Sequence, residues 1–304
     1  PPLIPANEMS MKHNDTWTVG KVLTWTTKRF NAAGLESARL DAEILLASAL
    51  GCDRVKIYTD YHKPLDPRER SAYRDLVRQR LKGVPTAYLV GHREFWSIDL
   101  LVDRGVLIPR PDTETLVEVA LELLKDMEAP WIADIGTGSG CIALALAKER
   151  QDAHLVATDL SPEALSVAQK NTHHLNLDVE LLEGSLVEPL VAAGHRTFHL
   201  VVSNPPYIAE KDGATAHPDV LEHEPKNALL AGDDGLDVLR PLVSDALQVI
   251  RPGGWLAVEM ALDQAAAVEA LFRDNGYQGV QVRSDLAGRD RVVYGQKSEQ
   301  DTKN

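Results

Sequence analysis

The chain has 304 residues, of which 44% are hydrophobic and 25% charged, a composition typical of a soluble globular protein with one large or two modest domains. No apolar run reaches the roughly 18 residues that a membrane helix needs. The two cysteines, Cys52 and Cys141, are too far apart for a disulfide framework or a metal-binding spacing. We therefore expect a cytoplasmic protein with no metal site and no membrane partner.

The net charge of −13 is unevenly distributed along the chain. Residues 16–90 carry 13 basic and 8 acidic side chains, a net charge of +5, whereas residues 91–304 carry 18 and 35, a net charge of −17. The acidic part repels a phosphate backbone, so we expect no direct nucleic-acid partner. The basic part can face an acidic partner.

The first part of the chain has helical periodicity. Residues 1–15 lack a basic segment followed by an apolar stretch, and we interpret them as a disordered leader rather than a signal peptide. Residues 16–85 predict a small helical domain, because apolar residues recur at helical spacing and glycines end each segment. Its helices are expected at residues 18–34, 38–51 and 66–83.

The third of these helices has clear start signals and a basic stripe. Asp66 is the expected N-cap, and Glu69 completes a capping box with it. Four basic residues spaced by four positions form one stripe along the helix: Arg70, Arg74, Arg78 and Lys82. Most such stripes are only solvated faces, and the alternative is a docking surface for an acidic partner.

The next segment, residues 86–110, is expected to be a β-hairpin linker. The apolar residues Phe95, Trp96, Ile98, Leu100 and Val102 predict two short strands. We place the turn between them near Asp103–Gly105, where aspartate and glycine are typical turn residues.

Residues 111–297 alternate between helical and strand-like patterns, which is typical of an α/β fold with a parallel sheet. The last two strands are joined by too short a connection for a crossover helix, so they should pair antiparallel. We therefore predict a seven-stranded, mostly parallel sheet with an antiparallel last strand, followed by a frayed tail at 298–304. The expected strands are 131–135, 154–159, 179–183, 198–204, 254–260, 279–285 and 291–296.

A glycine-rich loop follows the first of these strands. Its spacing is Gly136-x-Gly138-x-Gly140, shorter than the spacing that a dinucleotide-binding loop uses for its pyrophosphate. Asp134 precedes the loop, where a carboxylate can order the backbone and meet the ammonium group of S-adenosylmethionine. Asp159 ends the next strand and can accept both ribose hydroxyls, although the same pattern suits a tight turn before a helix. Together the two features predict a nucleoside site.

The most specific motif is Ser203-Asn204-Pro205-Pro206-Tyr207, at the end of a strand. Each proline lacks an N–H and holds the residue before it in an extended conformation. The Asn204 side-chain oxygen and the Pro205 carbonyl can thus accept both hydrogens of one –NH₂ group. Holding these hydrogens orients a weakly nucleophilic nitrogen toward a methyl donor. Tyr207 can pack its ring on a flat amide or base.

At these residues the chain resembles the HemK-type family of release-factor glutamine methyltransferases. The resemblance covers nearly the whole chain. The matching segments are DAEILLA (41–47), REFWS (93–97), IPRPDTE (108–114), DIGTGSG (134–140), SNPPY (203–207), HEPKNALLAGDDG (223–235) and GRDRVV (288–293).

The resemblance implies a class I methyltransferase domain, preceded by a helical domain that recognises the substrate. It also implies methylation of the glutamine in the Gly-Gly-Gln loop of peptide chain release factors. Asn204, Pro205, Pro206 and Tyr207 would hold the glutamine, with Arg110 on the substrate side. The residues that would line the S-adenosylmethionine pocket are Asp134, Gly136, Thr137, Gly138, Ser139, Gly140, Asp159 and Asn204.

The chain departs from the family pattern at two places. Gly184-Ser185-Leu186 stands where the family often has an acidic residue that can accept from the adenine amino group. Ser185 and Leu186 are therefore assigned as adenine contacts without such an acceptor. Ala261 stands where the family usually has glycine.

Three other functions stay open. The family includes a ribosomal-protein group, but the segment 110–114 favours the release-factor group. Adenine also has a flat –NH₂, so a nucleic-acid adenine methyltransferase is an alternative, against which the acidic catalytic part argues. The third is a non-catalytic S-adenosylmethionine sensor. For the enzyme we expect a monomer.

Overall fold

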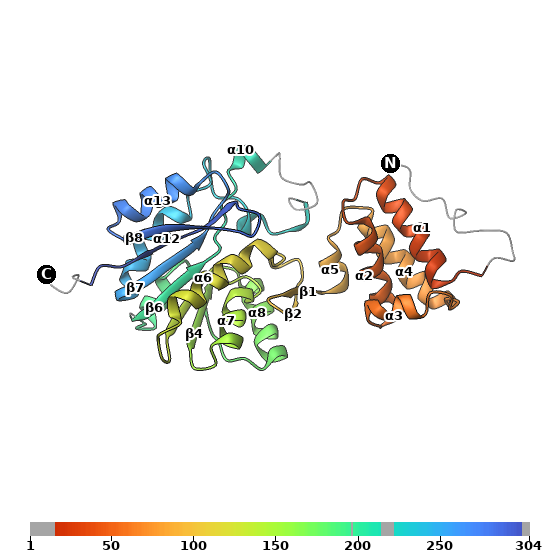
Figure 1. Cartoon of the computed structure of the whole chain (residues 1–304), viewed down its shortest axis with the longest axis horizontal. Coiled ribbons are helices and arrows are strands. Elements are labelled where there is room, and N and C mark those ends of the chain that lie inside the picture. The colour runs from red at the N-terminus through yellow and green to blue at the C-terminus, as the bar shows by residue number, and fades with distance from the viewer. Residues whose placement is uncertain (1–15, 196, 214–221, 300–304) are drawn as a thin grey trace. The chain divides into compact units, whose positions relative to one another are not determined.

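The computed structural model describes residues 16–195, 197–213 and 222–299 and divides into two compact units (Figure 1). The first unit ends at Val90 and the second begins at Gly91, and each has its own hydrophobic core. The predicted leader 1–15 and the end of the predicted tail, 300–304, lie outside the described residues. Among the described residues, no helix is long and apolar enough to span a membrane.

The first unit is helical. Buried aromatic and aliphatic side chains fill its core, among them Phe30, Leu45 and Tyr73. The three helices predicted here are confirmed as α1, α2 and α4, whereas α3 and α5 were missed because they are too short to show a helical period. The helices are α1 (Val19–Ala32), α2 (Ala38–Leu50), α3 (Arg54–Thr59), α4 (Pro67–Arg80) and α5 (Thr86–Val90).

Helix α4 begins with the predicted capping box. The Asp66 carboxylate accepts from the backbone N–H groups of Arg68 and Glu69, and the Glu69 carboxylate accepts from the N–H of Asp66. Within the basic stripe, the first two side chains are half-buried and the last two, Arg78 and Lys82, are exposed. The docking role of the stripe stays a prediction.

The predicted hairpin is present, but the expected position of its turn was wrong. Strands β1 (His92–Phe95) and β2 (Ile98–Leu101) pair antiparallel, and Trp96 and Ser97 connect them with φ angles of 49° and 53°. Two consecutive left-handed residues match the twist of the flanking strands better than the expected turn does. The aspartate and glycine at 103–105 instead form a turn after β2, where Asp103 Oδ1 accepts from the Gly105 N–H.

The segment expected to be wholly hairpin, 86–110, is also divided between the two units. Its first five residues are helix α5 of the first unit, and the hairpin belongs to the second. Helix α5 forms because the Pro85 carbonyl accepts from Tyr88 and Leu89, and Leu89 and Val90 pack against the helical core.

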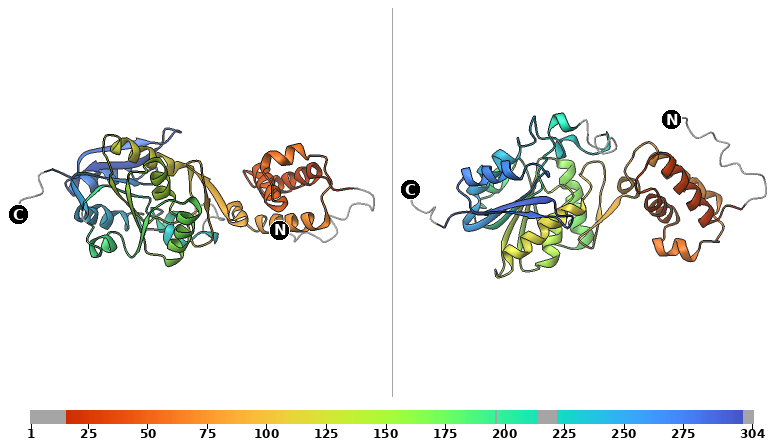
Figure 2. Two further views of the ribbon diagram at one scale, coloured as in Figure 1. Left: turned by 90° about the horizontal axis from the view of Figure 1, so that it is seen from below. Right: turned by 45° about the horizontal axis from the view of Figure 1, so that its top comes forward.

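The second unit contains a seven-stranded sheet with the order β5-β4-β3-β6-β7-β9-β8. Neighbours from β5 to β7 are parallel, and β9 is antiparallel to both β7 and β8, so the predicted fold is confirmed. The two last strands lie together at one edge (Figure 2). The strands are β3 (Trp131–Ile135), β4 (His154–Asp159), β5 (Glu180–Glu183), β6 (Phe198–Ser203), β7 (Ile250–Glu259), β8 (Gln278–Ser284) and β9 (Asp290–Gln296).

Helices cover both faces of this sheet (Figure 1). Alternate strand residues face opposite sides: Ile132 joins a core with α6 and α7, whereas Ala133 joins a core with α12 and α13. The helical segments are η1 (Pro111–Thr113), α6 (Glu114–Leu124), α7 (Cys141–Glu149), α8 (Pro162–Leu175), α9 (Glu188–Ala192), α10 (Glu210–Gly213), η2 (Lys226–Ala228), α12 (Leu239–Asp245), η3 (Ala246–Gln248) and α13 (Ala265–Asp274).

The strand order places a ligand site at one edge of the sheet. The chain runs outward from β3 to β5, then returns to the other side of β3 with β6, so the order reverses between β3 and β6. Ligands of open α/β sheets bind beyond the carboxyl ends of the strands at such a reversal. The glycine loop and Asn204 follow β3 and β6 at this point.

Candidate active site

The glycine loop is held by hydrogen bonds to its neighbouring strand. Gly136, Gly138 and Gly140 have φ angles of 71°, 57° and 84°, which other L residues rarely adopt. The N–H groups of Gly136 and Thr137 donate to the Thr158 carbonyl at 2.8 and 2.9 Å. The glycines are therefore required by the path of the backbone around the start of α7.

The Asp134 carboxylate stabilises this loop through two hydrogen bonds. Its Oδ2 accepts from the Thr137 hydroxyl at 2.7 Å and from the Ala143 N–H at 3.2 Å, which ties the loop to α7. The side chain is fully buried, and its Oδ1 has no hydrogen-bond partner in the part of the chain that is described. Burial raises the pKa of Asp134 to about 6, and the two hydrogen bonds oppose that rise.

Asp159 joins the loop to the start of α8. Its two carboxylate oxygens accept from the N–H groups of Gly138 at 2.8 Å and Ser161 at 2.9 Å. The tight-turn interpretation of Asp159 is thus realised in the structure, and the N-cap of α8 is Ser161, whose hydroxyl accepts from the Ala164 N–H. The turn does not exclude the ligand role, since a carboxylate has about four acceptor sites and only two are used.

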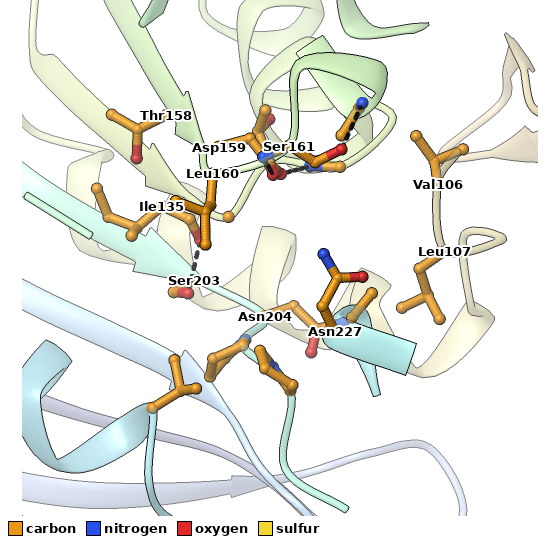
Figure 3. A pocket seen from close by; sticks show the side chains of 18 of the residues that line it. Val106, Leu107, Ile135, Thr158, Asp159, Leu160, Ser161, Ser203, Asn204 and Asn227 are labelled. Carbon is orange, nitrogen blue, oxygen red and sulfur yellow. Dashed lines mark hydrogen bonds between the residues drawn. The ribbon is translucent and has the colours of Figure 1, made fainter. Parts of the chain in front are cut away.

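These elements surround a cavity of about 370 Å³. Figure 3 shows Asp159 from β4 and Asn204 after β6 on different sides of it. Asp134, Gly140 and Tyr207 are not among the residues that line the cavity; Asp134 and Gly140 are buried, and Tyr207 is half-buried. The predicted site residues that line it are Arg110, Gly136, Thr137, Gly138, Ser139, Asp159, Ser185, Leu186, Asn204, Pro205 and Pro206.

The Asn204 side chain has a defined orientation. Its Nδ2 donates to the Thr113 hydroxyl at 3.1 Å, so its Oδ1 is turned away from that contact. Ser203, one residue earlier, donates to the Ile135 carbonyl at 2.7 Å and joins the ends of β6 and β3. Asn204 thus lines the same cavity as the glycine loop, with its Nδ2 occupied by Thr113.

Tyr207 is tied to a buried carboxylate. Its hydroxyl donates to Glu259 Oε1 at 3.1 Å, and Glu259 has no exposed surface. Burial raises the pKa of Glu259 to about 7, although Thr113, Arg291 and Tyr207 stabilise the charged form. Burial next to this carboxylate also raises the pKa of Tyr207.

Arg110 reaches a partner more than a hundred residues later. Its guanidinium contacts Glu224 Oε1 at 2.5 Å, and Glu224 Oε2 accepts from the Ile108 N–H at 3.1 Å. Glu224 is 5% exposed, and Pro225 and Asn227 after it line the cavity. This pair connects the two family-typical segments 108–114 and 223–235.

Sequence reasoning missed several of these residues. Thr113, Glu224 and Glu259 received no role, although Thr113 and Glu224 lie in the matching segments 108–114 and 223–235. Asn171 of α8 was missed as well: it is fully buried and bonds both to Leu101 of the hairpin and to the Ser139 carbonyl of the loop. A buried asparagine in a helix leaves no periodic signal that could have revealed it.

Cys141, at the start of α7, is half-buried and lines the cavity, but its thiol stays neutral. Burial raises the pKa of its thiol to about 12, and the neighbouring Asp134 adds to the effect. A helix N-terminus would have lowered it, so burial outweighs the helix dipole here. No group of three or more metal-ligating side chains is found among the residues described.

The sheet order, the glycine loop after β3 and the cavity at the reversal point define a class I methyltransferase fold. Two family models match: "PrmC N-terminal domain" over residues 21–91 and "Methyltransferase small domain" over residues 112–234. The catalytic domain of hMettl16 in complex with a MAT2A 3′UTR hairpin superposes with a TM-score of 0.55 at 18% identity, covering 76% of this chain and 84% of that one. That likeness concerns the fold alone.

Curated relatives are much closer in sequence. The chain is 46% identical to the release factor glutamine methyltransferase of Geobacter sulfurreducens over 92% of this chain and 97% of that protein. It is 43% identical to the one from Rhodopirellula baltica, over 95% of this chain and 100% of the relative. The chain belongs to the family of release factor glutamine methyltransferases.

Proposed function

We propose that this chain transfers a methyl group from S-adenosylmethionine to the side-chain amide nitrogen of the glutamine in the Gly-Gly-Gln loop of peptide chain release factors. The observation that carries the proposal is the fixed orientation of Asn204, which lines the same cavity as the nucleoside-type glycine loop. Family membership supports the choice of substrate.

The residues around the loop fit S-adenosylmethionine. A Cβ atom added at Gly136 or Gly138 would meet nothing within 4 Å, so a ligand can approach the backbone there. The cavity of about 370 Å³ lies in the usual range of roughly 300–1,000 Å³ for small-ligand pockets. Asp159 keeps free acceptor sites for ribose hydroxyls, while Ser185 and Leu186 line the cavity where the adenine would lie.

The bound cofactor supplies a methyl group that is already activated by a positively charged sulfur. The chain has to orient an amide nitrogen, whose lone pair is delocalised into its carbonyl. Asn204 Oδ1 and the Pro205 carbonyl accept the two amide hydrogens and fix the nitrogen in the direction of attack. Both oxygens also stabilise the positive charge that develops on the nitrogen. The products are the N-methylated amide, a thioether and a proton.

The remaining site residues have supporting roles in this proposal. Tyr207 packs against the flat amide, and Arg110, held by Glu224, orders the substrate side of the cavity. The helical first unit recognises the release factor. We place the reaction in the cytoplasm, with the enzyme acting as a monomer and without direct contact to nucleic acid.

The proposal is tested by methyl-transfer assays with labelled cofactor. Purified release factor, ribosomal protein and DNA are offered separately, and mass spectrometry locates the label. Label on the glutamine of the Gly-Gly-Gln loop is expected. Label on a ribosomal protein or on adenine instead would overturn the assignment of the substrate.

A further inference from the structure

Both ends of the segment Asn204–Tyr207 are anchored in one buried polar cluster. Asn204 Nδ2 donates to the Thr113 hydroxyl and the Tyr207 hydroxyl donates to Glu259 Oε1, each at 3.1 Å. Thr113 is 1% exposed and Glu259 is 0% exposed, so both are shielded from bulk solvent. The two anchors come from η1 and from the end of β7.

One oxygen of this cluster has no partner. Glu259 Oε2 is fully buried and accepts no hydrogen bond from the described residues. A buried carboxylate oxygen without a donor is costly, so a nearby donor should turn toward it. The Thr113 hydroxyl is suited to this, because it accepts from Asn204 and has its own proton to donate, and it stabilises the charged form of Glu259.

We propose that Glu259 is a positioning residue for methyl transfer, which acts through Thr113 to decide which end of the Asn204 amide faces the cavity. An ionised carboxylate can only accept, so Thr113 must donate to it. The Thr113 oxygen then accepts from Asn204 Nδ2, which leaves Oδ1 for the substrate. This inference rests on the proposed function, since only an amide or amine substrate needs an acceptor at that point.

The direction of this hydrogen-bond chain depends on Glu259 being an acceptor. If residue 259 donates instead, Thr113 accepts from it and donates to Asn204 Oδ1. The Asn204 side chain then turns its –NH₂ group to the cavity, where it opposes the hydrogens of the target amide. A single change at residue 259, outside the cavity lining, would thus disable the acceptor while leaving the cofactor loop intact.

The charged and titratable groups around Glu259 set the pH at which this reversal occurs. Arg291 on β9 and the Tyr207 hydroxyl favour its ionised form, while Asp112 in η1 disfavours it, and Cys141 on α7 stays neutral. Burial outweighs the favourable contacts and raises the pKa of Glu259 to about 7. Below that pH a protonated carboxyl can donate, so transfer should slow as the pH falls through 7.

The test compares Glu259→Gln, Thr113→Val and Thr113→Ser in the full-length chain. Single-turnover transfer to a release factor is measured at saturating S-adenosylmethionine, together with cofactor affinity by calorimetry and thermal unfolding. We expect Glu259→Gln and Thr113→Val each to slow transfer by about 10²–10³-fold, the usual effect of losing one preorganised polar contact. Cofactor affinity should stay within twofold, and Thr113→Ser should restore most of the rate that Thr113→Val loses.

Two further measurements separate this mechanism from a structural role. The double variant Glu259→Gln/Thr113→Val should transfer no more slowly than the slower single variant, because both substitutions interrupt the same series of hydrogen bonds. The decline of the rate below pH 7 should be absent from Glu259→Gln. The matched control Glu180→Gln, at the first residue of β5 and outside the cavity lining, should behave like the parent.

The outcomes distinguish this inference from the function on which it rests. If the parent chain does not label the release factor, the proposed function fails. If the parent does and Glu259→Gln transfers within a few-fold of it, the positioning role is overturned. Additive losses of transfer rate in the double variant would also overturn the positioning role. So would a Glu259→Gln variant whose loss of activity is explained by a lowered unfolding temperature.

Discussion

The two halves of the site are built in different ways: the cofactor half consists of the glycine loop with Asp134 and Asp159, and the substrate half of Asn204, Tyr207 and Arg110. In the cofactor half, the hydrogen bonds that shape the glycine loop join residues between 3 and 32 positions apart. In the substrate half, the hydrogen bonds of Tyr207, Asn204 and Arg110 span 52, 91 and 114 positions. The cofactor half is therefore a local structure, and the substrate half exists only when the whole second unit has folded.

This difference predicts that substitutions in the two halves are separable. Changes in the local cofactor half should alter cofactor affinity. Changes in the substrate half should alter the rate of transfer and leave cofactor affinity nearly intact. A substitution that alters both quantities equally would break the comparison.

The largest effect is expected from Asn204→Ala. It removes the acceptor oxygen that orients the target amide, so single-turnover transfer to a release factor should fall about 10²–10³-fold. Cofactor affinity, measured by calorimetry, should change only little, because Asp159 and the glycine loop are untouched. If transfer persists within a few-fold of the parent rate, the amide-holding mechanism is wrong.

In the cofactor half, Asp159→Ala should lower the affinity for S-adenosylmethionine roughly ten- to a hundredfold. Hydrogen bonds to charged groups contribute about 1.5–3 kcal/mol, and the substitution also frees the N–H groups of Gly138 and Ser161. Asp159→Asn is the matched control: it keeps one acceptor and should lose less. Unchanged affinity in a folded alanine variant would remove Asp159 from the site.

The sequence predicted these two halves unequally, for the same physical reason. The strands, the glycine loop and Asp159 follow from short segments with local periodicity and turn residues, and their elements are confirmed. The Asn-Pro-Pro-Tyr segment was also predicted from the sequence, but its hydrogen-bond partners Thr113 and Glu259 were not. Thr113 is 91 positions from Asn204 and Glu259 is 52 positions from Tyr207, and no local pattern indicates a partner so far away. The hairpin turn was misplaced because Trp96 and Ser97 are not typical turn residues.

A smaller effect, about tenfold, should appear in the pH dependence of cofactor binding through Asp134. Its pKa is raised to about 6 by burial, so it is charged above that pH. Asp134 does not line the cavity and acts on the cofactor's ammonium group through its charge, so affinity should fall as the pH decreases through 6. Stability should change in the opposite direction. A native pKa above the unfolded value of about 3.9 means that the free energy of unfolding decreases as the pH rises from 4 through 6.

Calorimetry and chemical denaturation at pH 5, 6 and 8 check both trends for Asp134. In Asp134→Asn, which cannot ionise, cofactor affinity should be low and nearly independent of pH, and the decline in stability should be absent. An affinity that is pH-independent in the parent would leave Asp134 as a residue that only orders the loop.

The smallest effect concerns the helical first unit. If this unit binds the release factor, it adds substrate-binding residues that are even further in sequence from Asn204 than Arg110 is. Arg78 of α4 and Lys82, in the turn just after the end of α4 at Arg80, are the exposed members of the predicted basic stripe, so reversing both to Glu should leave the helical core intact. If the stripe docks an acidic surface of the release factor, the association rate should fall a few-fold, because exposed charges act mainly through long-range attraction. The loss should be larger at low salt, since screening limits such attraction to about 8–10 Å at physiological ionic strength.

A short Gly-Gly-Gln peptide provides the control, because it lacks the acidic surface of the intact factor that the stripe would contact. Its methylation by the Arg78→Glu/Lys82→Glu variant should match that by the parent. Equal losses on peptide and intact factor would indicate damage to folding, which thermal unfolding would report. If neither substrate is affected, the stripe is a solvated face, and substrate selection then lies entirely in the second unit, with the residues that hold Asn204, Tyr207 and Arg110.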